Sequence, residues 1–107
     1  MKDLIVKKSK IHGKGVFANK DFKKGETVLK WQPKILKKSD VVKLTKKQKT
    51  YVHISHGKPL LMSYPEKFVN HSDRPNTKPK GHSDVAIRNI TKGEEITTNY
   101  GKKYSKF

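Results

Sequence analysis

Three short segments of the chain carry residue types that could do chemistry. The first, GKGVFA at residues 13–18, places two glycines one residue apart. Glycines at this spacing allow a tight turn and let the backbone approach a ligand closely. Taken alone, such a segment is more often a structural turn than a binding loop, so both interpretations stay open.

The second segment, FVNHSDRPN at residues 68–76, is a polar loop that follows a hydrophobic pair. The side-chain amide of Asn70 offers two donors and an acceptor, so it could hold a zwitterionic ligand. The alternative is a loop whose Asn and Pro residues serve only its own turns.

The third segment, ITKGEEITTNYG at residues 90–101, predicts a turn followed by a strand over 95–100. By itself it places Tyr100 in the core, as expected of an aromatic side chain there. Its turn KGE at 92–94 has a counterpart in KGE at 24–26, which precedes another predicted strand.

The elements that must position these segments are short strands joined by long loops. Apolar runs bounded by turn residues predict strands at 4–6, 16–18, 27–31, 60–62, 84–90 and 95–100. A weak apolar stripe predicts one short, mostly solvated helix from Val41 to Val52, with Ser39 and Asp40 as its N-cap. Pro65 can open a further helical turn. No repeat or linker divides the chain, so we expect one mainly β domain over 1–107.

The composition excludes several kinds of site. The chain has 107 residues and no cysteine, which excludes disulfides, Cys-ligated zinc, iron–sulfur clusters and a cysteine nucleophile. No apolar stretch approaches the ~20 residues of a membrane span, and no secretory signal is visible. His12, His53, His56 and His82 have no supporting carboxylate cluster, so we expect no metal site.

The charge is strongly positive. Lys and Arg total 26 against 9 Asp and Glu, which gives a formal net charge of +17, and 24 of the basic residues are Lys. Such a field attracts nucleic acid or anionic lipid in a salt-dependent way, although it can equally serve solubility. Because Lys is a flexible point charge, we expect any nucleic-acid binding to be non-specific attraction to the backbone.

Taken together, in this order and at these separations, the three segments resemble the SET domain of protein-lysine methyltransferases. Residues 70–76 look like the family's N-H-S-C-x-P-N loop, and residues 93–101 like its G-E-E-[IL]-T-x-x-Y-G segment. Residues 13–15 look like its N-terminal G-x-G turn. The resemblance covers the chain from about Lys7 to Tyr104 and is closest in size to the stand-alone minimal forms of viruses and prokaryotes.

The resemblance implies a SET-domain fold of small curved β-sheets with little helix, in which the C-terminal segment passes beneath a loop as a pseudoknot. The loop at 70–76 would lie there against the strand at 95–100. Residues 39–57 would form a variable insert, beside which a substrate peptide would pair as an added strand. Residues 101–107 would form a C-terminal tail.

The resemblance also implies that S-adenosylmethionine sits in a surface pocket. Backbone groups of Lys14 and Gly15 would meet its methionine portion, and the Asn70 side chain would hold its ammonium. The adenine would meet backbone groups of His71. The C-terminal aromatics complete the set of residues implied for the cofactor, which is Lys14, Gly15, Asn70, His71, Tyr104 and Phe107.

The target lysine would enter a channel from the opposite face, lined by Trp31, Tyr100 and Tyr104. Tyr100 matches the family's catalytic tyrosine, and its hydroxyl can orient the amine without acting as a formal base. The nucleophile must be a neutral amine, although a free lysine has a pKa near ~10.4. An apolar aromatic channel disfavours the ammonium form and helps its proton to leave.

Departures from the family pattern bear on the partners. Asp73 replaces the loop cysteine, so we expect no zinc, and the pocket lid must come from the tail 101–107 or from a second subunit in a homodimer. Lys30 and Lys34 stand where the family often has acids, and Asn99 where it often has Asp. A basic channel mouth would repel a basic histone-like tail, which favours a target lysine in an acidic context or one bound to nucleic acid.

The sequence therefore predicts methyl transfer from S-adenosylmethionine to the side-chain amine of a lysine in a protein substrate. The alternative is a nucleic-acid-binding module that keeps the SET scaffold without turnover. No membrane partner is expected. The expected location is the cytoplasm or nucleoid in a prokaryotic or viral setting, and the nucleus, with its chromatin, in a eukaryotic host.

Overall fold

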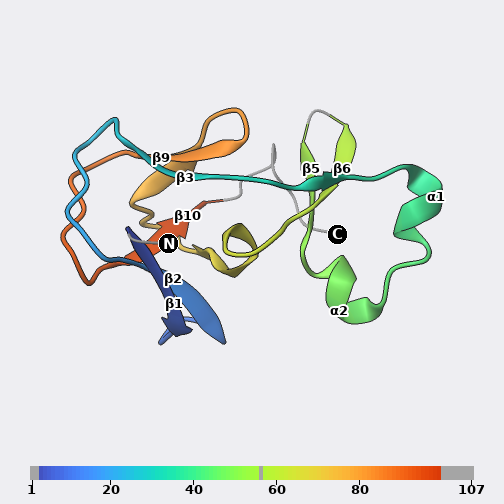
Figure 1. The fold of residues 1–107 in the computed structure, drawn as a ribbon, viewed down its shortest axis with the longest axis horizontal. Helices are drawn as coiled ribbons and strands as arrows, with labels where there is room; N and C mark the ends of the chain where they lie inside the picture. Colours follow the sequence, from blue (N-terminus) through green and yellow to red (C-terminus); the bar gives the residue numbers. More distant parts are fainter. Residues whose placement is uncertain (1–2, 56, 100–107) are drawn as a thin grey trace.

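The fold consists of two β-sheets that lie end to end along a molecule 41 Å long (Figure 1). The computed structural model describes residues 3–55 and 57–99. Within this part of the chain the larger sheet has seven strands, namely β1 (Leu4–Lys8), β2 (Lys14–Ala18), β3 (Thr27–Lys30), β7 (Asn70–His71), β8 (Thr77–Pro79), β9 (Ser83–Ala86) and β10 (Glu95–Thr98). The smaller sheet has three, namely β4 (Lys34–Ile35), β5 (Val52–Ser55) and β6 (Lys58–Leu61).

The strand order of the larger sheet brings distant segments together. Its order is β1-β2-β10-β8-β9-β3, with β7 also paired to β10. Strand β10 runs antiparallel to β2 on one side and parallel to β7 and β8 on the other. Thr97 pairs with Asn70 and Thr98 with His71, so the loop at 70–76 lies against β10 as expected. The mainly β prediction for the fold is confirmed.

Among residues 3–55 and 57–99, helix is confined to three short pieces, α1 (Lys38–Val41), α2 (Lys46–Lys49) and the 3-10 turn η1 (Glu66–Phe68). The predicted single helix from Val41 to Val52 is wrong, because the chain stops and restarts at two separate caps. Asp40 accepts from the backbone N–H of Lys37 at 3.0 Å, so Lys37 and not Ser39 is the first N-cap. Thr45 and Gln48 then form a reciprocal capping box that opens α2.

The two KGE turns have the same geometry. Gly25 and Gly93 have φ of 91° and 98°, a left-handed conformation that favours glycine. In each turn the following glutamate accepts from a backbone N–H three residues earlier, at 3.1 Å for Glu26 and 3.0 Å for Glu94. The repeated tripeptide is thus a repeated turn that starts β3 and precedes β10.

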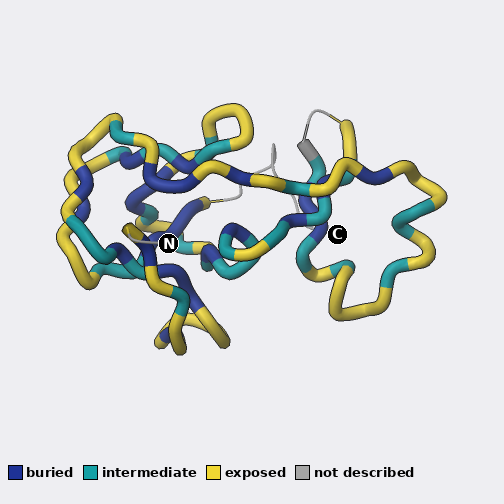
Figure 2. Tube along the Cα trace, viewed as in Figure 1, coloured by how far each residue is buried: buried dark blue, intermediate teal, exposed yellow. Residues whose placement is uncertain are grey.

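The core lies where the strands of the larger sheet converge, whereas the lobe that carries α1 and α2 is mostly exposed or half-buried (Figure 2). Neither α1 nor α2 contains a buried residue. The most deeply buried apolar side chains are Val16, Val52, Leu60, Ile90 and Ile96. In the part of the chain that the structure describes, no helix is long and apolar enough to span a membrane.

A carboxyl group is buried beneath this core. Asp84 is 2% exposed, and its Oδ2 accepts from the indole N–H of Trp31 at 2.9 Å. The pKa of Asp84 is raised to about 7, mainly by burial; the hydrogen bond from the Trp31 indole lowers this pKa, and the negative charge of Glu66 raises it. The folded protein therefore holds a proton on Asp84 at pH values where the unfolded chain has lost it.

Replacing Asp84 with Asn should change how stability depends on pH. Between about pH 4 and pH 7 the native state binds one proton more than the unfolded chain, so Asp84 makes the free energy of unfolding fall by about 1.4 kcal/mol per pH unit as the pH rises. Asp84→Asn keeps the acceptor for Trp31 and should remove this fall. Urea unfolding at pH 4 to 8 measures the difference, which should grow with pH in favour of the variant. Asp73→Asn, at an exposed loop position, is the control, and parallel curves for Asp84→Asn and the wild type would contradict the assignment.

Candidate functional site

The described residues form a cavity with a volume of about 600 Å³. It opens between the turn that joins β1 to β2, the end of α2, and the segment that runs from η1 into β7. This size suits a small organic ligand. The residues that line it are His12, Gly13, Lys14, Lys47, Thr50, Tyr51, Lys67, Phe68, Val69 and Asn70.

Asn70 is the polar side chain whose hydrogen bonds are best defined at this cavity. Its Nδ2 donates to the carbonyl oxygens of His12 and Lys14, both at 3.1 Å. It also lies 2.9 Å from Oε2 of Glu95 and 3.2 Å from Oγ of Ser9. Carbonyl and carboxylate oxygens only accept hydrogen bonds, so they determine which end of the amide is the amino group. Among the described residues, nothing donates to Oδ1, which leaves this oxygen as an acceptor for a ligand.

Aromatic rings and lysines form the opposite part of the cavity lining. Tyr51 and Phe68 meet edge to face, with their ring centroids 6.1 Å apart. The ammonium of Lys67 lies 5.2 Å from the Tyr51 centroid and 5.1 Å from that of Phe68, and Lys14 lies 5.8 Å from the latter. These cation–π contacts hold positive charge at an apolar surface. The lining therefore combines a cationic region, suited to a carboxylate, with the amide oxygen of Asn70, suited to an ammonium.

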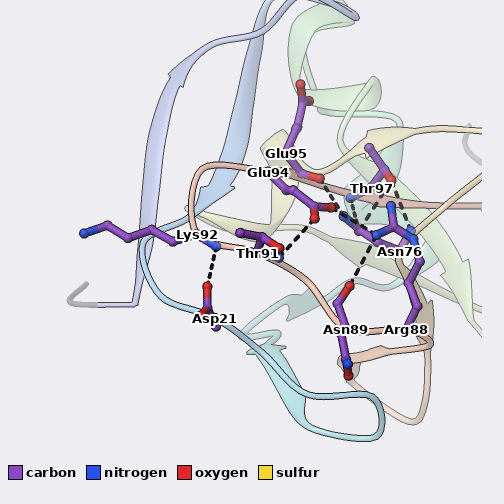
Figure 3. A network of polar contacts seen from close by, with 9 residues as sticks. All are labelled: Asp21, Asn76, Arg88, Asn89, Thr91, Lys92, Glu94, Glu95 and Thr97. Carbon is purple, nitrogen blue, oxygen red and sulfur yellow. Dashed lines mark hydrogen bonds and ion pairs between the residues drawn. The ribbon is translucent and has the colours of Figure 1, made fainter.

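The strand behind Asn70 is held in place by a second asparagine. Asn76 is 1% exposed, and Figure 3 shows its side chain directed at β10. Its Nδ2 donates to the carbonyl of Glu95 at 2.7 Å, and its Oδ1 accepts from the backbone N–H of Thr97 at 2.8 Å. Asn76 thereby replaces a strand partner for two backbone groups of β10 and keeps the loop at 70–76 in contact with that strand.

The structure brings only part of the predicted site together. Lys14 and Asn70 line the cavity, while Gly15 lies next to it in β2, against the Glu95 side chain. His71 is half-exposed with its ring nitrogen 3.2 Å from Asp73 and does not line this cavity.

Of the three residues predicted to line the lysine channel, only Trp31 lies among the described residues. Trp31 is 8% exposed, hydrogen-bonded to Asp84 and stacked 6.1 Å from His82, so it belongs to the core cluster. Tyr100, Tyr104 and Phe107 lie outside the described residues. The channel, the catalytic role of Tyr100 and the cover over the adenine stay predictions.

Sequence reasoning missed several residues of the cavity. His12, Lys47, Thr50, Tyr51 and Phe68 line it, although none was predicted to bind a ligand. Tyr51 belonged to the weak apolar stripe of the predicted helix and Phe68 to the hydrophobic pair before the polar loop, while Lys47 lay on the solvated face of that helix. Lys47 and Tyr51 reach the turn between β1 and β2 because of how the insert at 39–57 folds, and no local sequence motif predicts that arrangement. Among the described residues, no group of three or more His, Cys, Asp or Glu is placed to hold a metal ion.

The fold and the arrangement of these loops agree with the comparison to known families. The chain matches the SET domain family over residues 13–101, and it belongs to that family.

Two kinds of curated relative cover nearly the whole chain. A variant-silencing SET domain-containing protein of Plasmodium falciparum is 32% identical over 97% of the chain, and the histone-lysine N-methyltransferase trithorax of Drosophila virilis is 30% identical over 92%. The chain spans only 5% and 3% of the length of these two proteins.

Solved structures show the same fold at lower sequence identity. A candidate histone methyltransferase of Plasmodium falciparum has a TM-score of 0.78 at 24% identity and covers 95% of this chain, which in turn covers 96% of that one. The Polycomb Repressive Complex 2 of Chaetomium thermophilum, solved in an autoinhibited conformation bound to S-adenosylmethionine, has a TM-score of 0.78 at 22% identity. It covers 96% of this chain, which covers 16% of that one.

Asn76→Ala should destabilise the fold more than a comparable change on the surface. The substitution leaves the partly buried carbonyl of Glu95 and the buried N–H of Thr97 without their partner, at about 1–3 kcal/mol for each unsatisfied group. Urea unfolding should show a loss of roughly 3 kcal/mol. The matched control is Asn89→Ala, because Asn89 accepts one exposed backbone hydrogen bond from Lys24 and should cost about 1 kcal/mol. Equal losses of stability in the two variants would contradict the proposal that Asn76 holds the loop at 70–76 against β10.

Proposed function

We propose that the chain transfers a methyl group from S-adenosylmethionine to the side-chain amine of a lysine in a protein substrate. The observation that carries the proposal is Asn70, whose Oδ1 is left as an acceptor at a cavity of about 600 Å³. Membership of the SET domain family supports it. The likeness to relatives named as histone-lysine methyltransferases, and to a complex solved with S-adenosylmethionine, points the same way.

The residues of the cavity fit the amino-acid end of that cofactor. Oδ1 of Asn70 would accept from its ammonium, and the carbonyl oxygens beside it are already occupied by Nδ2. Lys14, Lys47 and Lys67 would supply positive charge for its carboxylate. Bound S-adenosylmethionine would supply a methyl group on a sulfonium sulfur. The lysine nitrogen would form its bond to the methyl carbon in line with the carbon–sulfur bond that breaks, and the electrons of that bond would stay on sulfur. Holding the reactants in line accounts for much of the rate in such a displacement.

Tyr100 is proposed to orient the attacking amine, as its place in the family motif implies. The lysine must lose one proton before it attacks, and an apolar aromatic channel favours this loss. Trp31 would belong to that channel, and its indole is already committed to Asp84. Its ring would then be held in one orientation by a buried hydrogen bond.

Isothermal calorimetry with S-adenosylmethionine tests the cofactor proposal. We expect Asn70→Ala to weaken binding by about 10- to 100-fold, because one hydrogen bond to a charged group is lost. Asn89→Ala, an exposed asparagine far along the chain, is the control and should bind as the wild type does. With labelled cofactor, Tyr100→Phe should lose methyl transfer to a protein pool while keeping cofactor binding. A well-folded wild type that binds no S-adenosylmethionine would refute the proposal.

The lobe that carries α1 and α2, taken as residues 34–61, has a charge that suggests the class of substrate. Residues 34–61 contain eight lysines and a single acid, Asp40. The two outer strands of the smaller sheet, β4 and β5, each have one edge without a partner strand among the described residues. An extended peptide added at such an edge would lie in a strongly positive field. We therefore propose a target lysine flanked by acidic residues.

Peptides that differ only in the flanks of one lysine would test this preference. We expect kcat/KM to be higher for acidic than for basic flanks, and the difference to shrink as salt is raised from about 20 to 300 mM. Lys43→Glu with Lys46→Glu should reduce the preference about 5- to 30-fold, at roughly 0.5–1 kcal/mol for each exposed pair. Lys8→Glu with Lys10→Glu, outside the lobe, is the control. Absence of a flank preference, together with tight and salt-steep DNA binding, would instead favour the nucleic-acid-binding alternative.

A further inference from the structure

We infer that Glu95, together with Ser9, is a positioning residue that holds the Asn70 amide with its oxygen toward the cavity. The inference rests on the proposed function, because it concerns how the cofactor ammonium would be recognised. Glu95 in β10 and Ser9 in the turn that joins β1 to β2 would then both belong to the site, although neither would touch the ligand.

The first argument is the hydrogen-bond geometry around Nδ2 of Asn70. Glu95 contributes the shortest of its contacts, 2.9 Å from Oε2, and two carbonyl oxygens contribute the others that can only accept. If the amide were rotated by 180°, Oδ1 would face all three of these acceptors with no proton between them. The rotated state would therefore be strongly disfavoured while Glu95 is present.

The second argument is that Glu95 itself is held from behind. The hydroxyl of Ser9 lies 2.7 Å from Oε1 and 2.9 Å from Oε2 of Glu95, and it donates its proton to this carboxylate. The same Oγ accepts from the backbone N–H of Ile11 at 2.9 Å. Ser9 is 9% exposed, so the contact is largely shielded from water. Residues that are 86 positions apart in the sequence thus connect β10 to the turn that borders the cavity.

The third argument is the identity of residue 15. Gly15 has no left-handed φ, so its backbone alone does not require glycine. A Cβ atom at this position would overlap the carboxylate of Glu95 and lie 3.0 Å from Cβ of Ser9. The second glycine of the GKG turn therefore makes room for Glu95. The close approach expected between this turn and a ligand is, at Gly15, an approach to a side chain of the protein.

The electrostatics of the site explain why a carboxylate is useful there. Three lysines line the cavity, and each would repel the ammonium of the cofactor. Glu95 places one negative charge behind Asn70, directly on the side of the amide that is opposite the proposed ligand. It polarises the amide so that Oδ1 is a better acceptor. Recognition of the ammonium would then depend on Glu95 through Asn70.

The test is a double-mutant cycle measured by calorimetry with S-adenosylmethionine as the probe. Glu95→Ala should weaken binding about 10-fold and Asn70→Ala about 10- to 100-fold. If Glu95 acts through Asn70, the double variant should bind within about 2-fold of Asn70→Ala alone. Glu95→Gln retains an acceptor for Nδ2 and should recover most of the affinity, to within about 3-fold of the wild type.

The control for charge and position is Glu94→Ala, since Glu94 is the adjacent carboxylate and pairs with Arg88 at 3.0 Å away from the cavity. It should change the affinity less than about 2-fold. Ser9→Ala, which removes only the hydroxyl behind Glu95, should weaken binding about 3-fold and serves as the second variant where Glu95→Ala does not fold.

Each result separates the inference from the proposed function. A wild type that binds no S-adenosylmethionine defeats the proposed function. If the wild type binds, three results would each contradict only the positioning role of Glu95. These are additive losses of affinity in the double variant, a Glu95→Gln variant that binds no better than Glu95→Ala, and a Ser9→Ala variant that binds as the wild type does. Thermal unfolding of every variant shows whether a loss of affinity follows a loss of fold.

Discussion

The position of β10 between β2 and the loop at 70–76 is the constraint on which the rest of the structure depends. Strand β10 has four residues, of which two pair with the antiparallel β2 and two with the parallel β7. The side chain of Asn76 adds to these short pairings, with a donor for one backbone group of β10 and an acceptor for another. Because Asn76 is 1% exposed and its hydrogen bond with the N–H of Thr97 is buried, the pairing is costly to break. The contact that closes the fold is therefore a side-chain contact.

The candidate site is a consequence of that closure. Once β10 is in place, Glu95 lies between the N-terminal turn and Asn70, and both are brought to one cavity. The insert adds Tyr51 and α2 from the other side. No single element of the chain contains the site, since its parts come from the beginning, the middle and the end of the described residues. Changes that loosen β10 should for this reason be felt in ligand binding as well as in stability.

The sequence was informative where a motif acts locally, and less so where contacts form across the fold. The KGE turns, the short strands and the Asn70 segment follow from residue types within a few positions. The split of the predicted helix into α1 and α2 depends on Thr45 and Gln48, whose capping pattern outweighs a weak apolar stripe. Gly15 illustrates the limit, because glycine is required there by a glutamate 80 positions later. The hydrogen bond from the Trp31 indole to Asp84 is a second example, because no motif near either residue indicates this contact between positions 53 apart.

Most acidic side chains make contacts within the fold, so few of them pair with the basic side chains of the surface. Nearly every carboxylate is used by the fold itself. Glu26, Glu94, Asp21 and Asp40 accept from backbone N–H groups at turns and caps. Glu66 and Asp84 are buried, and Glu95 holds Asn70. The ion pairs of the described residues therefore engage few of the basic side chains, namely Lys20, His71 and Arg88. Most of the +17 charge is not balanced by acids of the chain, which favours an anionic partner. A substrate selected by this surface would carry its target lysine among acidic residues, in contrast to a basic tail that the same field would repel.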